Sequence, residues 1–295
     1  MQQIHLNSLE LEKNRNKTKR WRNIAIILFI SLLGIAWRNS QTFRTGDYIG
    51  LIRIDSEIFE DYEKEDRIKK IAQNHHVKAL IVEINSPGGS VVGSEKMYHA
   101  LRKVSQYKPV IALLGSCATS GAYMTALGAD YIMAHHGTLT GSLGVILDSF
   151  EVVDAAKSLG IKFNLLKSSP LKGTPNPVEV LAPEAREVLM RNISDVYNFF
   201  VQLIATRREL DLEYVKSIAD GSTCVAQQAL ALKLIDKIGN MDDAVEWLKN
   251  EKGVQTTQIE LIELEKLDVW YSILDKVCAT VYNYLANHSK AIMAK

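Results

Sequence analysis

The chain has 295 residues, of which 47% are hydrophobic and 23% charged, and its formal net charge is +1 at pH 7. This length allows one or two domains with enough apolar residues for a buried core. The near-zero net charge gives no indication of a nucleic-acid partner. Because the three cysteines, Cys117, Cys224 and Cys278, are scattered, their spacing predicts neither a disulfide framework nor a metal site.

The N-terminal segment combines a basic tail with an apolar run. Residues 1–23 hold six basic and two acidic residues, a net charge of +4, and the uncharged run 24–37 follows. A basic flank before an apolar run predicts a membrane anchor whose N-terminus stays in the cytoplasm. With the flanking tryptophans the run covers 21–37, which reaches the lower limit of ~17 residues for a span. An uncleaved anchor is favoured over a cleaved signal peptide, which would use Gly34 and Ala36 as the small residues at the cut.

From residue 48 onward, strand-like and helix-like segments alternate, which predicts an α/β fold. The strand 77–84 is apolar nearly throughout, as in a parallel sheet covered on both faces. We expect one compact domain over 46–250. The expected strands are 48–54, 77–84, 109–115, 130–135 and 161–166, and the expected helices are 64–76, 91–104, 120–127 and 183–207.

Apolar residues also recur at helical spacing near the C-terminus, which predicts an amphipathic helix over 260–295. Such a helix could close the core of its own domain, contact another subunit or lie on a membrane. The pattern does not distinguish these roles.

A polar turn containing Gly88 and Gly89 joins the strand 77–84 to the helix that follows. A P-loop would need a lysine after Gly93, and a dinucleotide loop would need G-x-G-x-x-G; both are absent, so we reject nucleotide binding here. A plain turn is one interpretation. The other is a ligand-binding loop, because α/β sheets place their sites at the C-terminal ends of strands and glycines let backbone N–H groups approach a ligand.

The next expected strand ends in a similar way, with Ser120 between Thr119 and Gly121 at the start of a helix of small residues. A serine at this position is commonly a simple helix N-cap. Alternatively, the N–H groups of Gly89 and Gly121 form an oxyanion hole, and Ser120 is the nucleophile of an acyl-transfer reaction.

A nucleophilic serine needs a general base, and the chain offers two kinds of candidate. His135 and His136 follow the strand 130–135, although a histidine pair at such a place is commonly ordinary surface. Lys167 and Lys172 are the other candidates, since a desolvated site can favour the neutral form of a lysine. The residues alone do not choose between the two lysines.

Five blocks of sequence together resemble a bacterial family, signal peptide peptidase A of the protease IV type, in their order and spacing. The resemblance covers about 48–245 and implies the crotonase-like fold shared with the Clp protease subunit. That fold is an α/β, repeated β-β-α superhelical core, here expected behind an N-terminal membrane anchor helix. It also implies a serine endopeptidase with a Ser/Lys dyad. The blocks are INSPGGS (84–90), SCATSGAYMTALGAD (116–130), GTLTGSLGVI (137–146), KSSPLKGTPNP (167–177) and ALALKLIDKIG (229–239).

Carried over by position, the resemblance implies a role for each residue of the site. Ser120 would be the nucleophile and Lys172 the general base, with Ser142 orienting the lysine. Gly89 and Gly121 would supply the oxyanion N–H groups. The resemblance implies no metal and no cofactor.

The chain departs from the family pattern at two places. Gly173 follows the matched lysine where the family often has an acidic residue, and Gly221-Ser222 stands where it often has Gly-Arg. Lys167 lies five residues before the matched position. Because neither departure touches the dyad, activity is still expected.

The resemblance also implies partners and a location. Short family members complete the Ser/Lys pair between neighbouring subunits, so we expect a ring-like homo-oligomer. The expected substrates are signal peptides left in the membrane and misfolded exported proteins. The expected location is the bacterial inner membrane, crossed once and contacted through the anchor, with the catalytic domain on the extracytoplasmic side and no nucleic-acid partner.

Three other functions stay open on the sequence. A crotonase-type acyl-CoA enzyme shares the oxyanion architecture but would need neither the anchor nor Ser120. A catalytically silent membrane scaffold of the same fold would not need Ser120, Lys172 and Ser142 to be intact. A Ser-His peptidase would use His135 or His136.

Overall fold

The computed structural model describes residues 46–264, together with Thr18, Lys19, Trp21–Asn23, Ala25, Ile26, Phe29 and Ser31, which are helical. The chain divides into two units, Met1–Gly46 and Asp47–Lys295. Within the described part, no helix combines the length and the apolar character needed to cross a membrane. The predicted basic tail, the anchor and the C-terminal helix lie largely outside the described residues, so they stay predictions.

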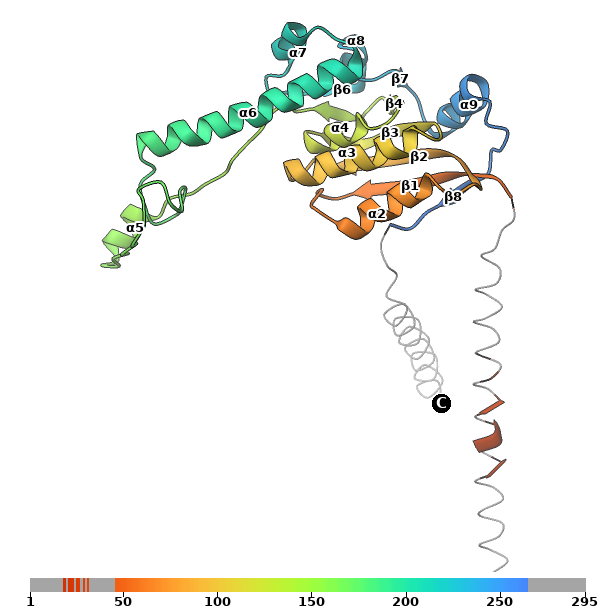
Figure 1. Cartoon of the computed structure of the whole chain (residues 1–295), viewed down its shortest axis with the longest axis horizontal. Helices are drawn as coiled ribbons and strands as arrows, with labels where there is room; N and C mark the ends of the chain where they lie inside the picture. Colours follow the sequence, from red (N-terminus) through yellow and green to blue (C-terminus); the bar gives the residue numbers. More distant parts are fainter. Residues whose placement is uncertain are drawn as a thin grey trace, which may run out of the picture. The chain divides into compact units, whose positions relative to one another are not determined.

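The second unit alternates strands and helices as expected for an α/β fold (Figure 1). Its strands are β1 (Tyr48–Asp55), β2 (Val77–Ser86), β3 (Val110–Thr119), β4 (Tyr131–Ala134), β5 (Leu139–Gly141), β6 (Thr223–Val225), β7 (Lys237–Ile238) and β8 (Ile259–Leu261). Its helices are α2 (Tyr62–Ile71), α3 (Val91–Ser105), α4 (Gly121–Ala126), α5 (Val153–Ser158), α6 (Pro183–Arg208), α7 (Leu212–Ile218), α8 (Ala226–Ala231) and α9 (Met241–Lys252).

The strands form one eight-stranded sheet in the order β6-β5-β3-β2-β1-β8, with β4 pairing with β3 and β7. All pairings are parallel except that of β5 with β6. The first half of β3 pairs with β4 at Ile111–Leu114, whereas its second half pairs with β5 at Cys117–Thr119. The neighbour of β3 on this side therefore changes from β4 to β5 between Leu114 and Cys117, a few residues before Ser120.

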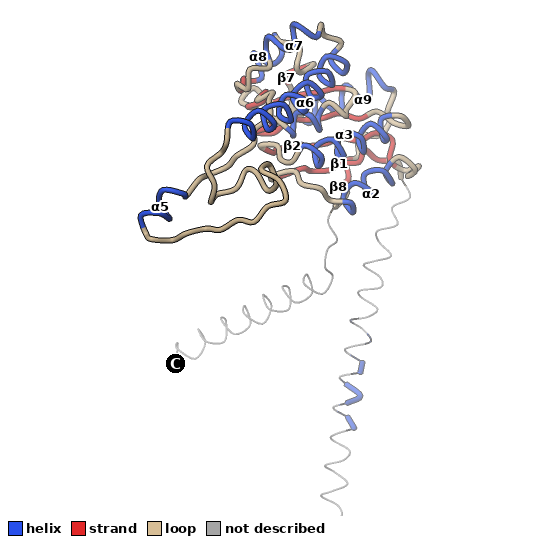
Figure 2. Tube along the Cα trace, turned by 60° about the vertical axis from the view of Figure 1, so that its left-hand side comes forward, coloured by secondary structure: helices blue, strands red, loops and turns tan. Residues whose placement is uncertain are grey.

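Alternate residues of the strands face two separate hydrophobic cores. In β2, Leu80, Val82 and Ile84 join the core that also contains residues of α2, α3 and α4. Ala79 and Ile81 point to the opposite face, where α9 packs. This arrangement of helices on both faces explains why the strand is apolar nearly throughout, and it confirms the predicted α/β class (Figure 2).

Residues 145–182, which we name the arm, leave the sheet between β5 and α6. They contain α5, and both views show them beyond the end of α6 that lies away from α7 (Figures 1 and 2). The strand predicted at 161–166 is wrong, because these residues form an exposed loop. An apolar extended segment becomes a strand only where a neighbouring strand takes up its backbone hydrogen bonds, and no described strand pairs with it.

Residues 260 and 261, where the C-terminal helix is predicted to begin, form a strand instead, and residues 265–295 lie outside the described part of the chain. Residues 259–261 form β8, which pairs in parallel with β1 and extends the sheet by one strand. The fold described here therefore continues to residue 264, beyond the expected domain limit at 250.

Candidate active site

Ser120 is the single residue between β3 and α4, and its backbone is in an uncommon conformation. Its φ is 53° and its ψ is −122°, values that few residues other than glycine adopt. Strained residues of this kind cluster at active sites. The side chain makes no capping hydrogen bond to α4, so the simple N-cap interpretation does not describe it.

The backbone of Ser120 is held on both sides. Its N–H donates to the carbonyl of Gly141 over 2.9 Å, and its carbonyl accepts the N–H of Met124 over 3.0 Å. The first bond ties the turn to β5, and the second begins the hydrogen-bond ladder of α4. The hydroxyl group is therefore presented by a fixed backbone.

The Gly-Gly turn lies against this serine. A Cβ atom on Gly88, whose φ is +111°, would lie 2.9 Å from the nitrogen of Gly121 and 3.1 Å from the Cβ of Ser120. A Cβ atom on Gly89 would lie 2.0 Å from the carbonyl oxygen of Ile58. Both positions therefore need glycine, because any side chain would push the turn away from Ser120 or from the segment beside it.

The segment around Ile58 clamps the turn through backbone hydrogen bonds. The N–H of Ile58 donates to the carbonyl of Gly88 over 2.7 Å, and the N–H of Ser90 donates to the carbonyl of Ile58 over 2.9 Å. Among the described residues, no backbone acceptor is found for the N–H of Gly89 or of Gly121. A Cβ atom on Gly121 would lie 3.3 Å from the nitrogen of Gly89, so the two N–H groups lie close together in space.

Ser142 lies at the end of β5, beside the same site. Its φ is 51°, and its N–H donates to the carbonyl of Ser222 over 2.7 Å. A backbone carbonyl accepts this bond, so the contact does not depend on the side chain at position 222. Ser120 directly follows β3 and Ser142 directly follows β5, and these two strands pair along the second half of β3.

These groups line one open cleft of about 730 Å³. Its walls combine polar and apolar surface, and its charged residues are two acids, Glu57 and Asp220. The N–H of Ser222 donates to Asp220 over 2.9 Å, and hydrogen bonds from Ser222 lower the pKa of that carboxyl group. The apolar and aromatic lining residues are Phe59, Leu143, Val145, Ile146, Ile193 and Tyr197.

Lys172 is not part of this cleft. It is an exposed residue of the arm, in a turn where its N–H donates to the carbonyl of Ser169 over 3.2 Å. The structure therefore brings together Ser120, Ser142 and the two glycines, but it does not bring Lys172 to them within one chain.

The other candidate bases are also away from the cleft. Lys167 forms an ion pair with Glu179, and this contact together with a hydrogen bond from Asn176 lowers the pKa of Glu179. His135 and His136 are exposed in the turn after β4 and do not line the cleft. Among the described residues, no cluster of histidine, cysteine or acidic side chains could hold a metal ion.

The family of the chain follows from comparisons with known proteins. The model of peptidase family S49 matches residues 102–255. The chain belongs to peptidase family S49. As an S49 member it is a serine-type peptidase, and this activity decides against the acyl-CoA enzyme and the silent scaffold.

Two relatives and one solved structure illustrate the likeness. A Synechocystis sp. protein named as a candidate protease is 37% identical over 66% of this chain and 71% of its own length. An Enterococcus faecium protein named as a candidate signal peptide peptidase SppA is 33% identical over 63% of this chain and 54% of its own length. A mutant of the 1510-N membrane-bound stomatin-specific protease has a similar fold, with a TM-score of 0.51 at 16% identity over 75% of this chain and 99% of its own.

Several residues of the cleft were not found by sequence reasoning. Glu57 and Phe59 come from a loop after β1, and Tyr197 comes from the middle of α6. None of them belongs to a motif with chemical meaning. They reach the cleft only because the sheet and α6 pack around it.

Proposed function

We propose that this S49 peptidase cleaves peptide bonds with Ser120 as the nucleophile and Lys172 of a neighbouring subunit as the general base. The observation that supports this proposal is the contrast between the two residues. Ser120 is strained, fixed and placed beside two N–H groups without backbone acceptors, whereas Lys172 is exposed on a projecting arm. A second copy of the chain would supply the base that the cleft lacks.

The reaction would proceed in two stages. The neutral amine of Lys172 takes the proton of the Ser120 hydroxyl while the serine oxygen attacks the peptide carbonyl carbon. The N–H groups of Gly89 and Gly121 hold the oxyanion, and the C–N bond then breaks as the lysine returns the proton to the leaving amine. Water, activated by the same lysine, attacks the resulting ester and releases the second product and the free serine.

Ser142 would orient the lysine in this scheme. Its backbone is anchored to Ser222, and its side chain lines the cleft that contains Ser120. Because the base acts only when neutral, activity should rise as the pH increases from acid to alkaline values. A pH–rate profile that stays flat over this range would count against a lysine base.

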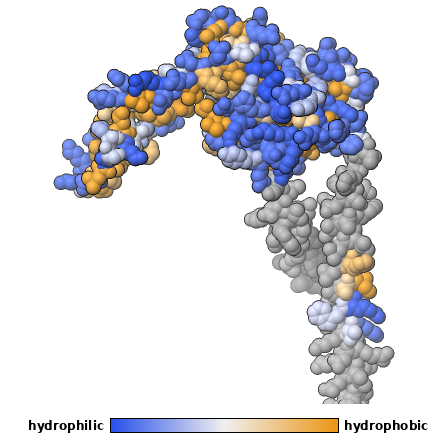
Figure 3. All heavy atoms as spheres, in the orientation of Figure 1, coloured by the Kyte–Doolittle hydropathy of each residue, from blue (hydrophilic) through white to orange (hydrophobic). Residues whose placement is uncertain are grey.

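The arm supports the proposal of a homo-oligomer. Its exposed apolar side chains include Ile146, Phe150 and Leu166, which are 83%, 70% and 99% exposed. Figure 3 shows apolar surface running along this part of the molecule. Apolar surface of this kind is typical of a protein–protein contact. A contact between one subunit's arm and its neighbour's cleft is heterologous, which closes into a ring when the rotation permits.

The proposed substrates are signal peptides and unfolded exported proteins. The apolar residues of the cleft walls suit the apolar core of a signal peptide, and the acidic residues Glu57 and Asp220 suit its basic flank. The name of the Enterococcus faecium relative is consistent with such substrates. The predicted anchor would keep the catalytic domain beside the extracytoplasmic face of the bacterial inner membrane.

The decisive experiment mixes two inactive variants. We expect Ser120→Ala and Lys172→Ala each to form oligomers without peptidase activity. When the two are dissociated, mixed in equal amounts and reassembled, about a quarter of the interfaces in a head-to-tail ring would join an intact serine to an intact lysine. Activity should therefore return to about a quarter of the wild-type value. A mixture that stays inactive would contradict a base supplied between subunits.

Two further variants serve as controls. Lys167→Ala should remain active, because this lysine is occupied by Glu179. The double variant His135→Ala/His136→Ala should also remain active, since both histidines lie outside the cleft. Loss of activity in the histidine variant, with Lys172→Ala unaffected, would favour the Ser-His peptidase instead.

A further inference from the structure

Ser94 carries a buried hydroxyl group that the proposed mechanism does not use. It is in the first turn of α3, and it is 0% exposed. Among the described residues, its Oγ is the buried side-chain oxygen or nitrogen atom without a hydrogen-bond partner. Leaving a hydroxyl group unpaired in the interior is unfavourable, and alanine would avoid this cost. Stability therefore does not explain a serine here.

The Ser94 side chain lies directly against Gly121. A Cβ atom on Gly121 would lie 2.2 Å from the Oγ of Ser94 and 3.1 Å from its Cβ. The same point lies 3.3 Å from the nitrogen of Gly89. Ser94 therefore occupies the contact between the first turns of α3 and α4, close to both of the proposed oxyanion donors.

The contact continues one turn along α4. The hydroxyl group of Thr125 donates to the carbonyl of Gly121 over 3.0 Å and lies 3.4 Å from the carbonyl of Ser94. The carbonyl of Gly121 lies in the same helix as Thr125, and the carbonyl of Ser94 faces the same hydroxyl group from across the interface of the two helices. With no side chain on Gly121, the separation of the helices at this level depends on the size of residue 94.

The two oxyanion donors belong to these two elements. Gly89 comes immediately before Ser90, the N-cap of α3, and Gly121 is the first residue of α4. Two N–H groups stabilise one oxyanion only when their separation matches its position. We propose that Ser94 is a positioning residue, whose side chain sets the spacing between the Gly89 and Gly121 N–H groups. This inference rests on the proposed function.

The size of serine accounts for its presence. Alanine would remove the oxygen that touches Gly121 and let the two first turns approach, whereas a larger residue would force them apart. The effect should fall on the transition state more than on substrate binding, because the oxyanion forms only as the bond is broken. A change in kcat without a change in KM is therefore the expected signature.

The test compares Ser94→Ala with the wild type in the full-length, solubilised protein. We expect the melting temperature to rise by about 2–4 °C, because an unpaired hydroxyl group is removed. We expect kcat for a peptide substrate to fall about 10-fold with KM within twofold. A peptide aldehyde, which forms an oxyanion on Ser120, should bind more weakly in the same proportion as kcat falls.

Ser105→Ala is the matched control, since it makes the same change at the other end of α3. The Ser105 hydroxyl contacts Asp130 and accepts a hydrogen bond from Arg102 over 2.7 Å, and it lies at the last residue of the helix. Its removal should lower the melting temperature and leave kcat within twofold. The two serine variants should therefore change stability and activity in opposite ways.

Two outcomes would overturn the inference. One is a Ser94→Ala variant whose kcat stays within twofold of the wild type. The other is a melting temperature that falls as far as in Ser105→Ala, since this would show that the hydroxyl group is paired in solution. Activity that persists in Ser120→Ala would instead contradict the proposed function, so the two failures are distinguishable.

Discussion

The sheet and its covering helices bury their apolar side chains, whereas the arm exposes several of them. In β2, Leu80, Ile81 and Val82 are fully buried, and Ser120 is held by hydrogen bonds from neighbouring strands and helix. In the arm, Leu166 is 99% exposed and Phe150 is 70% exposed. One copy of the chain thus fixes the backbone of the serine, whereas the segment that carries Lys172 stays exposed among the described residues.

Helix α6 connects the two regions and shows the same contrast within one element. Near its C-terminal end Phe200, Val201 and Ile204 are buried against the core. Toward the arm Met190 is 52% exposed, and Val188 and Leu189 are only partly covered. The apolar stripe runs along the whole helix, so its N-terminal half offers an apolar face that the described residues cover only in part.

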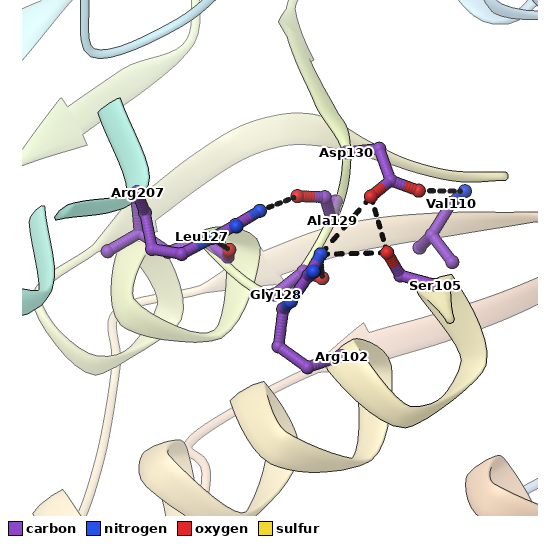
Figure 4. A network of polar contacts seen from close by, with 8 residues as sticks. All are labelled: Arg102, Ser105, Val110, Leu127, Gly128, Ala129, Asp130 and Arg207. Carbon is purple, nitrogen blue, oxygen red and sulfur yellow. Dashed lines mark hydrogen bonds and ion pairs between the residues drawn. The ribbon is translucent and has the colours of Figure 1, made fainter. Parts of the chain in front are cut away.

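The C-terminal end of α6 is fastened to the helix that follows Ser120 (Figure 4). Arg207 donates to the carbonyls of Leu127 and Ala129, each over 2.9 Å. These carbonyls lie just beyond the end of α4, where backbone acceptors lack intrahelical partners and the helix dipole is negative. Burial lowers the pKa of Arg207, yet an arginine stays charged under these conditions.

A second arginine completes the same network. Arg102 of α3 donates to Asp130 over 3.1 Å and to Ser105 over 2.7 Å, and Asp130 accepts the N–H of Val110 over 3.0 Å. The end of α4 is therefore tied to α3, to β3 and to α6 (Figure 4). The arm extends from a helix whose other end is fixed to the C-terminal end of α4, the helix that Ser120 precedes.

The largest effect should come from adding a side chain between the two proposed oxyanion donors. A Cβ atom in Gly121→Ala would overlap Ser94 and approach the nitrogen of Gly89, so we expect kcat to fall about 100-fold or more. Gly137→Ala, in the turn after β4, is the control, because its Cβ would meet nothing within 4 Å. Steady-state kinetics should show near-normal activity for the control, and equal losses in both variants would contradict the argument from contact.

The next effect tests whether the exposed arm is covered in an assembly. Leu166→Glu places a charge on the exposed apolar surface of the arm, and we expect the oligomer to dissociate and activity to fall about 10-fold or more. The melting temperature of the separated subunits should stay close to normal. Tyr107→Glu, at a 64% exposed position beside α3, should change neither property. Light scattering that finds Leu166→Glu still fully assembled would exclude this surface from the interface.

A smaller effect is expected at the end of α4. Arg207→Gln removes two charge-assisted hydrogen bonds to helix carbonyls, and we expect it to lower the free energy of unfolding by about 1–2 kcal/mol. Arg207→Lys keeps the positive charge but not the two-pronged geometry, so it should recover part of the loss. Denaturant unfolding measures both, and a Gln variant as stable as the wild type would show that the contact contributes nothing.

The smallest effect concerns the ion pair within the arm. The contact with Lys167 lowers the pKa of Glu179 below its ordinary value of 4.5, so its stabilising effect is complete above that value. The effect is lost as the pH falls through the lowered pKa and the carboxyl group takes up a proton. Near neutral pH, hydrogen exchange of the arm should be slower in the wild type than in Glu179→Gln. At pH values below the lowered pKa the two should converge, and a difference that persists would assign the protection to another contact.

The sequence alone was enough to predict the strands and helices from β1 to β4, the long helix α6 and the Gly-Gly turn that lies beside Ser120. Local sequence identified the apolar run 77–84, the Gly-Gly turn and Ser120, because each depends on residues close together in the chain. The strand predicted at 161–166 failed for a related reason: local pattern favours an extended chain, but only a neighbouring strand makes it part of a sheet.

Tertiary structure decided the contacts on which the chemistry depends. Ser94 and Gly121 lie 27 positions apart and meet only because α3 and α4 pack side by side on the same face of the sheet. Equally, only the folded chain shows that Lys172 stands away from the cleft although its motif is complete. Sequence periodicity reports which face of an element is apolar, whereas packing decides what covers it, and the large apolar side chains of the arm stay exposed among the described residues.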